Sequence, residues 1–134
     1  MKTMIILRGV PGCGKSTLAT LLHNIYSDST ICSNDTYMYE DGVYKWSPEK
    51  IKTAVELCFN RAENAMLAGM EIVIIDNTHC KEEYVKKYTD LAEKYGYQVI
   101  SIVVENRHGN KNIHNVNEET IDNMKRNLLK SIKL

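Results

Sequence analysis

The residues whose types and spacing most clearly suggest chemistry form the run Gly9-Val10-Pro11-Gly12-Cys13-Gly14-Lys15-Ser16. This run fits the pattern G-x-x-x-x-G-K-[S/T]. A glycine-rich turn of this kind points several backbone N–H groups inward, and the positive end of the following helix adds to them. Phosphate, with its negative charge and many acceptor oxygens, is the ligand that such an arrangement suits. The sequence therefore predicts a phosphate-binding loop at residues 9–16.

The side chains of this loop predict a nucleoside triphosphate bound together with a divalent cation. Lys15 would reach the outer phosphates, and the Ser16 hydroxyl would ligate Mg²⁺. The alternative is a chance match in a glycine turn, but an apolar stretch precedes the run and a helical pattern follows it. We expect ATP and Mg²⁺ as cofactors. The residues expected to bind them are Gly9, Gly12, Cys13, Gly14, Lys15, Ser16, Thr17 and Arg107, with Ser16 and Asp76 at the metal.

Short apolar runs alternate with amphipathic stretches along the chain, which predicts an α/β fold with a parallel sheet. Strands are expected at about 3–7, 30–33, 71–76 and 97–104, and helices at about 15–26, 47–69, 81–95 and from 117 onward. Residues 34–46 are expected to form a polar, aromatic loop that turns at Asp41-Gly42. We predict a single P-loop NTPase domain over residues 1–134. Its sheet order is expected to be second, third, first, fourth, with helices on both faces.

Composition limits the possible partners and compartment. The 134 residues carry a formal net charge of zero, so nucleic acid could be bound only by a local patch. No apolar segment is long enough to cross a bilayer, and Arg8 interrupts the apolar run that a signal peptide would need. The four cysteines form no C-x-x-C pair, and His79-Cys80 alone is a weak metal motif. We expect a cytoplasmic protein without a membrane partner.

Two carboxylates are expected to share a crevice with Lys15. Asp35 follows the second strand and Asp76 ends the third, and open parallel sheets bind ligands beyond the carboxyl ends of their strands. Phosphoryl transfer needs a carboxylate that accepts the acceptor's proton, for which Asp35 is the candidate. Asp76 would orient a Mg²⁺-bound water or the acceptor. The structural alternatives are a helix N-cap for Asp35 and a turn cap for Asp76.

A mobile cation must neutralise the charge that spreads over the transferring group. Arg107 is the first candidate because it lies beside Gly109 in a polar loop, as a closing lid would. Arg126, on the last helix, is the second. His108 and His114 are interpreted as surface residues of the loop and are left out of the chemistry.

Four aromatic residues in the segment 34–46 have two interpretations. Tyr37, Tyr39, Tyr44 and Trp46 could stack the bases of a single strand, with Lys45 contacting a phosphate. They could equally form a hydrophobic cover under the loop. The sequence leaves both interpretations open.

Together these residues resemble the polynucleotide 5′-kinase branch of P-loop kinases, the type found in phages and in RNA- and DNA-repair enzymes. The likeness covers nearly the whole chain. The features that carry it are Gly9 to Thr17, Asn34-Asp35-Thr36-Tyr37, Asp41-Gly42-Val43-Tyr44-Lys45-Trp46, Ile74-Ile75-Asp76-Asn77-Thr78, and His108-Gly109 with Glu118-Glu119-Thr120-Ile121.

The resemblance implies that Asp35 is the general base for a 5′-hydroxyl, that Lys15 and Ser16 bind ATP and Mg²⁺, and that a lid arginine touches the donor phosphates. One position departs from the family, because Met38 stands where an arginine grips the acceptor's phosphate. We therefore predict a kinase that transfers the γ-phosphoryl of ATP to a hydroxyl, first of all the 5′-OH of DNA or RNA. The predicted substrate-binding residues are Asp35, Tyr37, Asp76 and Asn77.

The expected partners are a nucleoside triphosphate and single-stranded or end-exposed nucleic acid. A phage protein acting in the host cytoplasm would fit the compact form of the chain. Two alternatives stay open: a kinase of a small metabolite or nucleotide, and an ATP-binding module without catalytic activity.

Overall fold

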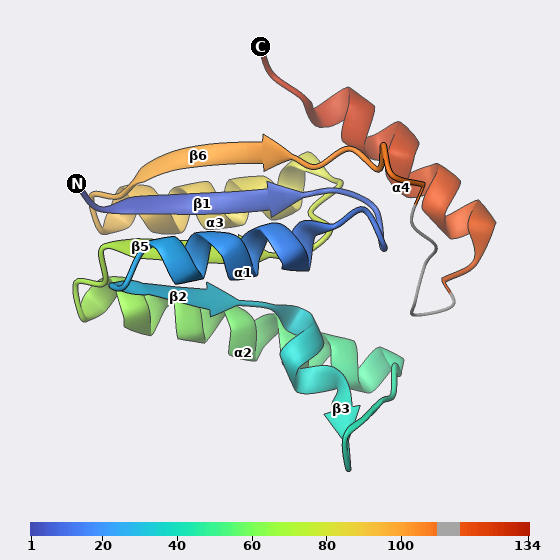
Figure 1. The fold of residues 1–134 in the computed structure, drawn as a ribbon, viewed down its shortest axis with the longest axis horizontal. Helices are drawn as coiled ribbons and strands as arrows, with labels where there is room; N and C mark the ends of the chain where they lie inside the picture. Colours follow the sequence, from blue (N-terminus) through green and yellow to red (C-terminus); the bar gives the residue numbers. More distant parts are fainter. Residues whose placement is uncertain (110–115) are drawn as a thin grey trace.

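The computed structural model describes residues 1–109 and 116–134 (Figure 1). Strands and helices alternate along most of the chain. In order they are β1 (Thr3–Arg8), α1 (Lys15–Ile25), β2 (Ser29–Cys32), the 3₁₀ helix η1 (Asn34–Met38), β3 (Tyr39–Glu40), β4 (Val43–Tyr44), α2 (Pro48–Leu67), β5 (Ile72–Asp76), α3 (Glu82–Lys94), β6 (Gln98–Val103) and α4 (Glu118–Ser131).

The main sheet has four parallel strands in the order β2-β5-β1-β6. This confirms the predicted order of second, third, first, fourth. Every residue of the central strands β1 and β5 is buried. Parallel strands covered on both faces become nearly continuous apolar runs, and both runs were visible in the sequence. The loop after β1 therefore leaves the sheet at the middle of its carboxyl edge.

Helices cover both faces of the sheet, with α1 on one face and α2 and α3 on the other (Figure 1). Successive side chains of β1 point to opposite faces, so the strand contributes to two cores. Met4 and Ile6 belong to the core under α2 and α3, while Ile5 and Leu7 pack with Ala19 of α1. This double anchoring fixes the end of β1, from which the phosphate loop starts.

The segment 34–46 is more structured than the predicted loop. It forms η1 and then the hairpin β3–β4, which projects from the body of the protein (Figure 1). The Asp41-Gly42 turn was predicted correctly. Both residues have positive φ, 50° and 77°, as the two-residue turns of β-hairpins require. Strands of two residues are too short to show a period in the sequence, so only the turn was predictable.

The helix boundaries agree closely with the expected ones. The Ser47 side chain caps α2 by accepting from Lys50 N at 3.1 Å, and Pro48 occupies the first helical position. Asn117 caps α4 by accepting from Glu119 N at 2.7 Å. Both caps follow from the preference of serine and asparagine for this position.

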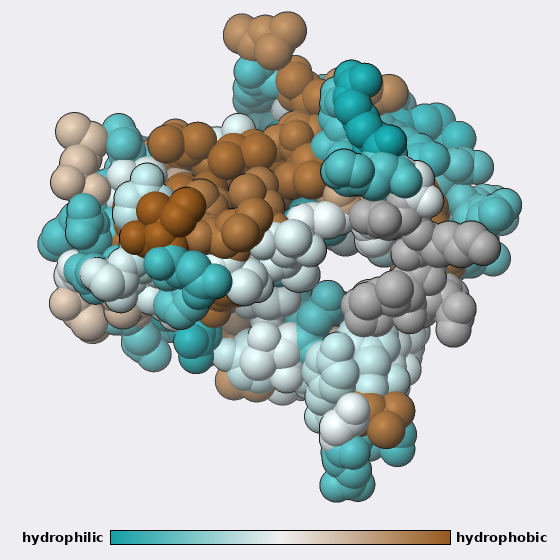
Figure 2. Space-filling model, viewed as in Figure 1, coloured by the Kyte–Doolittle hydropathy of each residue, from teal (hydrophilic) through white to brown (hydrophobic). Residues whose placement is uncertain are grey.

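The surface has an apolar area over β1, β6 and α1 (Figure 2). Leu21 and Ile25 of α1 and Ile100 of the edge strand β6 are exposed large hydrophobic residues on these elements. Among the described residues, no helix combines the length and the apolar character needed to cross a membrane. All four cysteines are buried and free.

Candidate functional site

The phosphate loop is held against the end of the sheet by its first glycine. Gly9 N donates to Thr78 O at 3.0 Å, which ties the loop to the turn after β5. A Cβ at Gly9 would lie 2.6 Å from Cys13 Sγ and 2.8 Å from Val104 O. Only glycine fits this approach, so the loop is packed between its own cysteine and the end of β6. Cys13 is buried, and its backbone N donates to Val10 O at 3.2 Å.

The start of α1 is the least protected helix start in the described chain. Gly14 takes the N-cap position with φ 102°, and no side chain caps the helix. No acidic residue lies in the first turn of α1, whereas α2, α3 and α4 each carry one or two. Uncapped N–H groups at a positive helix end bind anions. The geometry fits the predicted phosphate ligand, and Gly12 (φ 83°) gives the loop its other left-handed turn.

Lys15 is only 9% exposed. Its ammonium donates to Val10 O at 3.2 Å and lies 3.6 Å from Cys13 Sγ, and both of these partners are neutral. A buried ammonium is costly unless a negative group balances it. The hydrogen bond to Val10 O holds the ammonium over the loop, where the negative oxygens of a phosphate could balance its charge.

The Ser16 hydroxyl donates to Asp76 Oδ2 at 2.9 Å, across 60 residues of sequence. Burial raises the pKa of Asp76, the Ser16 hydrogen bond and the Lys15 charge oppose that rise, and the negative charge of Asp35 adds to it. The charges of Lys15 and Asp35 both act on Asp76, which indicates that the three residues lie near one another; their roles in a shared site stay predictions. Serine oxygen and carboxylate are also the two protein ligands predicted for Mg²⁺.

The donor set fits Mg²⁺ that arrives with a nucleotide. Within the described residues there is no group of three or more His, Cys, Asp or Glu side chains that could hold a metal ion by themselves. Mg²⁺ typically takes one or two protein oxygens and completes its shell with phosphate and water. Ser16 and Asp76 could supply such a pair. Thr17 lies beside them and lines an open hollow of about 380 Å³ at the start of α1.

Asp35 lies in the first turn of η1, whose N-cap is Ser33. The alternative that Asp35 is itself the cap is therefore wrong. One oxygen of the carboxylate, Oδ1, accepts from the Tyr44 hydroxyl at 3.4 Å. Burial and the nearby Asp35 charge raise the pKa of Tyr44 to about 12, so its hydroxyl stays protonated and can donate. Sequence reasoning missed this contact because it depends on the hairpin.

Asn77 connects the two halves of the site. Its Oδ1 accepts from Asn34 N at 2.8 Å, which fixes the start of η1 to the end of β5. Its Nδ2 lies 3.6 Å from Cys58 Sγ and 3.4 Å from His79 Nε2. Asn77 is 7% exposed and holds Asp35's helix in place; a contact with substrate stays a prediction. Asn34 Oδ1 is a buried oxygen that has no hydrogen-bond partner among residues 1–109 and 116–134.

Arg8 is a buried residue near the site whose role sequence reasoning missed. Its Nε donates to His79 O at 3.0 Å, and its Nη2 donates to Ser131 Oγ of α4. A second tie joins Lys133 to Glu82 at 3.0 Å. These contacts fasten the end of α4 beyond the carboxyl ends of the strands (Figure 1). The sequence does show an arginine at the end of an apolar strand, which could have indicated a buried polar contact. Its partner Ser131, 123 residues away, was not predictable.

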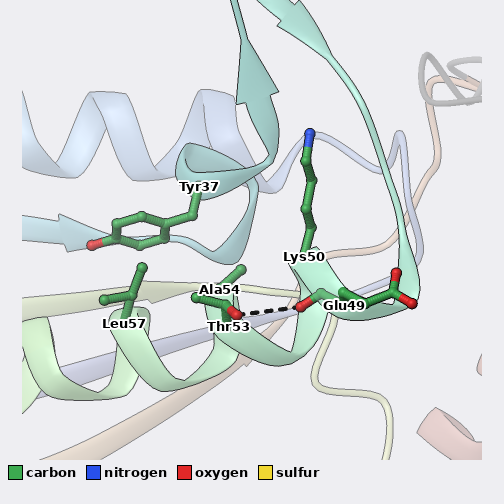
Figure 3. Close-up of a pocket in the computed structure, with 6 residues that line it drawn as sticks. All are labelled: Tyr37, Glu49, Lys50, Thr53, Ala54 and Leu57. Atoms are coloured by element: carbon green, nitrogen blue, oxygen red, sulfur yellow. Dashed lines mark hydrogen bonds between the residues drawn. The ribbon is translucent and has the colours of Figure 1, made fainter.

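Tyr37 belongs to a different environment from the phosphate loop. It is half-buried and packs on the core under α2. It also lines a pocket of about 230 Å³ between η1 and α2, where its ring lies over Ala54 and Leu57 (Figure 3). Lys50 and Glu49 stand at the other end of this pocket (Figure 3). The structure does not bring Tyr37 to the Lys15 side, and its predicted substrate contact stays a prediction.

The two candidate lid arginines are both exposed. Arg107 pairs with Glu105, which raises the pKa of the guanidinium, and 83% of its side chain is exposed. Arg126 Nη2 donates to Asn123 Oδ1 on its own helix. A role over the donor phosphates stays a prediction for either residue. His108 is exposed, as expected, whereas His114 lies outside the described residues.

The aromatic residues of the segment 34–46 had two interpretations, a hydrophobic cover and a surface for stacking bases, and different residues fit different ones. Tyr37 is part of a hydrophobic cover, because it packs on the core. Tyr39 and Trp46 are 51% and 59% exposed. Tyr44 lies between these extremes and meets the Tyr39 ring edge-on, with ring centroids 5.6 Å apart. Met38, the departure from the resembling family, is fully buried and forms part of the interior rather than the crevice.

A four-stranded parallel sheet with this strand order, a glycine-rich loop after its first strand and a Ser16–Asp76 pair defines a P-loop kinase-like domain. The chain belongs to the family described as AAA domain (AAA_33), which matches residues 4–130.

Curated relatives are similar over most of the chain. Human NEDD4-binding protein 2 is 33% identical over 128 residues, which is 90% of this chain and 7% of that protein. The 2',3'-cyclic-nucleotide 3'-phosphodiesterase of Pongo abelii is 33% identical over 102 residues, which is 75% of this chain and 24% of that protein. The chain thus spans less than a quarter of the length of these relatives.

Solved structures share the fold at low sequence identity. A chain of the Pnkp1/Rnl/Hen1 RNA repair complex aligns with a TM-score of 0.66 and 18% identity over 97% of this chain and 45% of that chain. The APS kinase CysC of Mycobacterium tuberculosis, as a Cys556Ala mutant, aligns with a TM-score of 0.58 and 11% identity over 96% of this chain and 97% of that chain. These similarities establish the α/β fold of P-loop kinases for this chain.

Proposed function

We propose that this chain is an ATP-dependent kinase that transfers the γ-phosphoryl group to a hydroxyl, first of all the 5′-OH of a nucleic acid. The observation that carries the proposal is the convergence of three charged side chains. Ser16 and Asp76 are hydrogen-bonded at 2.9 Å, and Asp76 is electrostatically coupled to both Lys15 and Asp35. This coupling supports a nucleotide site with a carboxylate nearby that could accept a proton.

Each side chain has a distinct part in the proposed reaction. ATP with Mg²⁺ supplies the activated phosphoryl group. Lys15 and the first N–H groups of α1 hold its negative oxygens, and Ser16 and Asp76 would hold the metal. Asp35 takes the proton of the attacking hydroxyl at its carboxylate. Arg107 is the candidate for the cation that closes over the phosphates.

The choice of acceptor rests on family resemblance and on the relatives. One solved neighbour is part of an RNA repair complex, and one curated relative is named a 2',3'-cyclic-nucleotide 3'-phosphodiesterase. These names support a nucleotide or nucleic acid acceptor. The buried Met38 supports the rival, a kinase of a small metabolite or nucleotide, because it removes a charged grip on the acceptor's phosphate.

The test compares acceptors and an Asp35 variant. Labelled ATP is offered with a 5′-hydroxyl oligonucleotide and, separately, with pooled small hydroxyl compounds. Asp35→Asn should keep ATP affinity and lower turnover by about 10²–10⁴-fold, since it removes the proton acceptor. Asp41→Asn is the matched control, because Asp41 is an exposed carboxylate on the neighbouring hairpin and asparagine tolerates its positive φ.

Three results would change the proposal. Transfer to small compounds alone would replace the nucleic acid acceptor with the rival substrate class. If the native chain and Asp35→Asn bound ATP equally and showed no difference in turnover, the chain would be an ATP-binding module. Equal losses in Asp35→Asn and Asp41→Asn would show that the carboxylate acts through general charge rather than as a base.

A further inference from the structure

We propose that the edge-to-face pair of Tyr39 and Tyr44 is the platform on which the terminal base of the acceptor strand stacks, and that Tyr44 positions Asp35 for it. This inference rests on the proposed function and names how that site recognises its acceptor. Both tyrosines of this platform belong to the hairpin β3–β4, which projects beside η1 (Figure 1).

The geometry connects an exposed ring to the proposed base in two contacts. The ring of Tyr39, 51% exposed, meets the ring of Tyr44 at a centroid distance of 5.6 Å and an interplanar angle of 76°. The Tyr44 hydroxyl then donates to Asp35 Oδ1 at 3.4 Å. A base stacked on Tyr39 would therefore bring its own 5′ end toward Asp35. Stacking on an aromatic ring suits every base, because each has a π-face.

The charges around the hairpin favour stacking over phosphate binding. Lys45 pairs with Glu40 at 3.8 Å, and Lys50 pairs with the same carboxylate. Asp41 at the turn adds another negative charge. The two nearby lysines are thus already engaged by Glu40. Recognition by the hairpin should depend on the base rather than on the phosphates of the strand.

Tyr44 acts as a positioning residue rather than a catalytic one. It is half-buried, and its hydroxyl stays protonated because its pKa is raised to about 12. The donated hydrogen bond from Tyr44 orients the Asp35 carboxylate, which takes the acceptor's proton in the proposed reaction. The Tyr44 ring also meets the Tyr39 ring edge-on, so Tyr44 contacts both the exposed ring and Asp35.

The first experiment measures binding without catalysis. A fluorescent single-stranded 5′-hydroxyl oligonucleotide is titrated with the native chain, Tyr39→Leu and Tyr39→Phe in the absence of ATP. Tyr39→Leu should raise Kd by about 5- to 140-fold, the value of one stacked base. Tyr39→Phe keeps the ring and should stay within about twofold. Tyr26→Leu is the control, an exposed tyrosine ring at the end of α1.

Salt dependence and turnover give two further readouts. The slope of log Kd against log salt should be smaller than about 0.7, the contribution of one phosphate contact on a single strand. In the transfer assay, Tyr44→Phe keeps the ring and loses the hydroxyl. It should lower kcat by about tenfold and leave the acceptor KM unchanged, since a hydrogen bond to a charged group is lost.

The outcomes separate this inference from the proposed function. Ring-dependent binding without phosphoryl transfer would reject the kinase and keep the platform. Transfer with a native-like Kd for Tyr39→Leu would keep the kinase and overturn the platform. Equal weakening by Tyr26→Leu, or no binding of the oligonucleotide by the native chain, would also overturn it. An unchanged kcat in Tyr44→Phe would remove the positioning role.

Discussion

The phosphate loop and the β3–β4 hairpin differ in how firmly the rest of the chain fixes them. The loop is locked by Gly9 against Cys13 and Val104, and Lys15 is almost fully buried. The hairpin is held mainly at its base, by the Lys45 N to Met38 O hydrogen bond of 2.8 Å and by the Glu40–Lys50 pair. Tyr39 and Val43 of the hairpin are exposed, as is Trp46 just after it.

This difference suggests that the two regions bind different substrates, the loop the triphosphate and the hairpin the acceptor. A triphosphate always has the same shape, so a rigid cradle of backbone N–H groups lowers the cost of binding it. An acceptor varies in sequence and conformation, and an exposed hairpin with aromatic rings can adapt to it. We therefore expect substitutions in the loop to lower ATP binding and turnover together. In the hairpin, loss of the Tyr39 ring should weaken acceptor binding, and loss of the Tyr44 hydroxyl should lower turnover.

The largest effect is expected for Lys15→Ala, which tests the rigid side. Removing the cation that faces the phosphates should lower kcat/KM by about 10³–10⁵-fold. ATP affinity, measured by calorimetry, should fall as well. The cost of burying the ammonium opposes its favourable interaction with the Asp76 charge, so thermal stability without ATP should change little.

Lys52→Ala is the matched control, an exposed lysine on α2. If Lys15→Ala bound ATP and turned over like the Lys52→Ala control, the nucleotide site would have to lie elsewhere. A large loss of stability in Lys15→Ala would instead indicate a structural role for the lysine in the loop.

The rigid side was also the more predictable one. The strand order and the phosphate loop follow from local patterns: buried apolar runs, a glycine turn and helix caps at Ser47 and Asn117. The Ser16–Asp76 proximity followed from topology, because Asp76 ends β5 and Ser16 follows the loop that leaves the carboxyl end of the neighbouring strand β1. These features depend on short stretches of chain or on the sheet alone.

The remaining contacts depend on packing that no local pattern reveals. The Tyr44–Asp35 hydrogen bond needs a hairpin whose strands have two residues each. The Arg8–Ser131 contact joins residues 123 positions apart. The contact between Asn77 Oδ1 and the backbone of η1 was not predicted either, because it joins residues 43 positions apart; the predicted substrate contact of Asn77 stays a prediction.

A smaller effect is expected for Gly9→Ala, which tests how tightly the loop is packed. The added Cβ would meet Cys13 Sγ at 2.6 Å and Val104 O at 2.8 Å. Val104 cannot easily withdraw, because its own N donates to Arg8 O at 2.7 Å. Overpacking of this kind lowers the free energy of unfolding by about 1–3 kcal/mol. Urea denaturation would measure the loss.

The double variant Gly9→Ala with Cys13→Ala separates the two contacts. It removes the sulfur but leaves the carbonyl in place, so only part of the stability should return. Full recovery would show that the cysteine alone excludes a side chain at this position. No loss in Gly9→Ala itself would show that the loop adapts, and the contrast with the hairpin would then disappear.

The smallest effect at neutral pH is expected for His79, in the turn that joins both regions. The ring is buried against Tyr88, and burial lowers the pKa of His79 to about 3. In the unfolded chain the His79 imidazole binds a proton near pH 6.5, whereas in the folded state it stays neutral at this pH. Stability should therefore fall as the pH drops from 6.5 toward 3, by up to about 1.4 kcal/mol for each pH unit.

His79→Asn should flatten this pH dependence, because asparagine tolerates the φ of 42° and does not titrate. Urea midpoints between pH 7 and pH 4 would measure it, with His108→Asn as the control for an exposed histidine. His79 O accepts from Arg8, while Asn77 two residues earlier holds η1. An unchanged slope in His79→Asn would mean that the turn opens enough to protonate the ring. The rigidly held part of the structure would then end at Thr78, and the turn from His79 onward would be as adaptable as the hairpin.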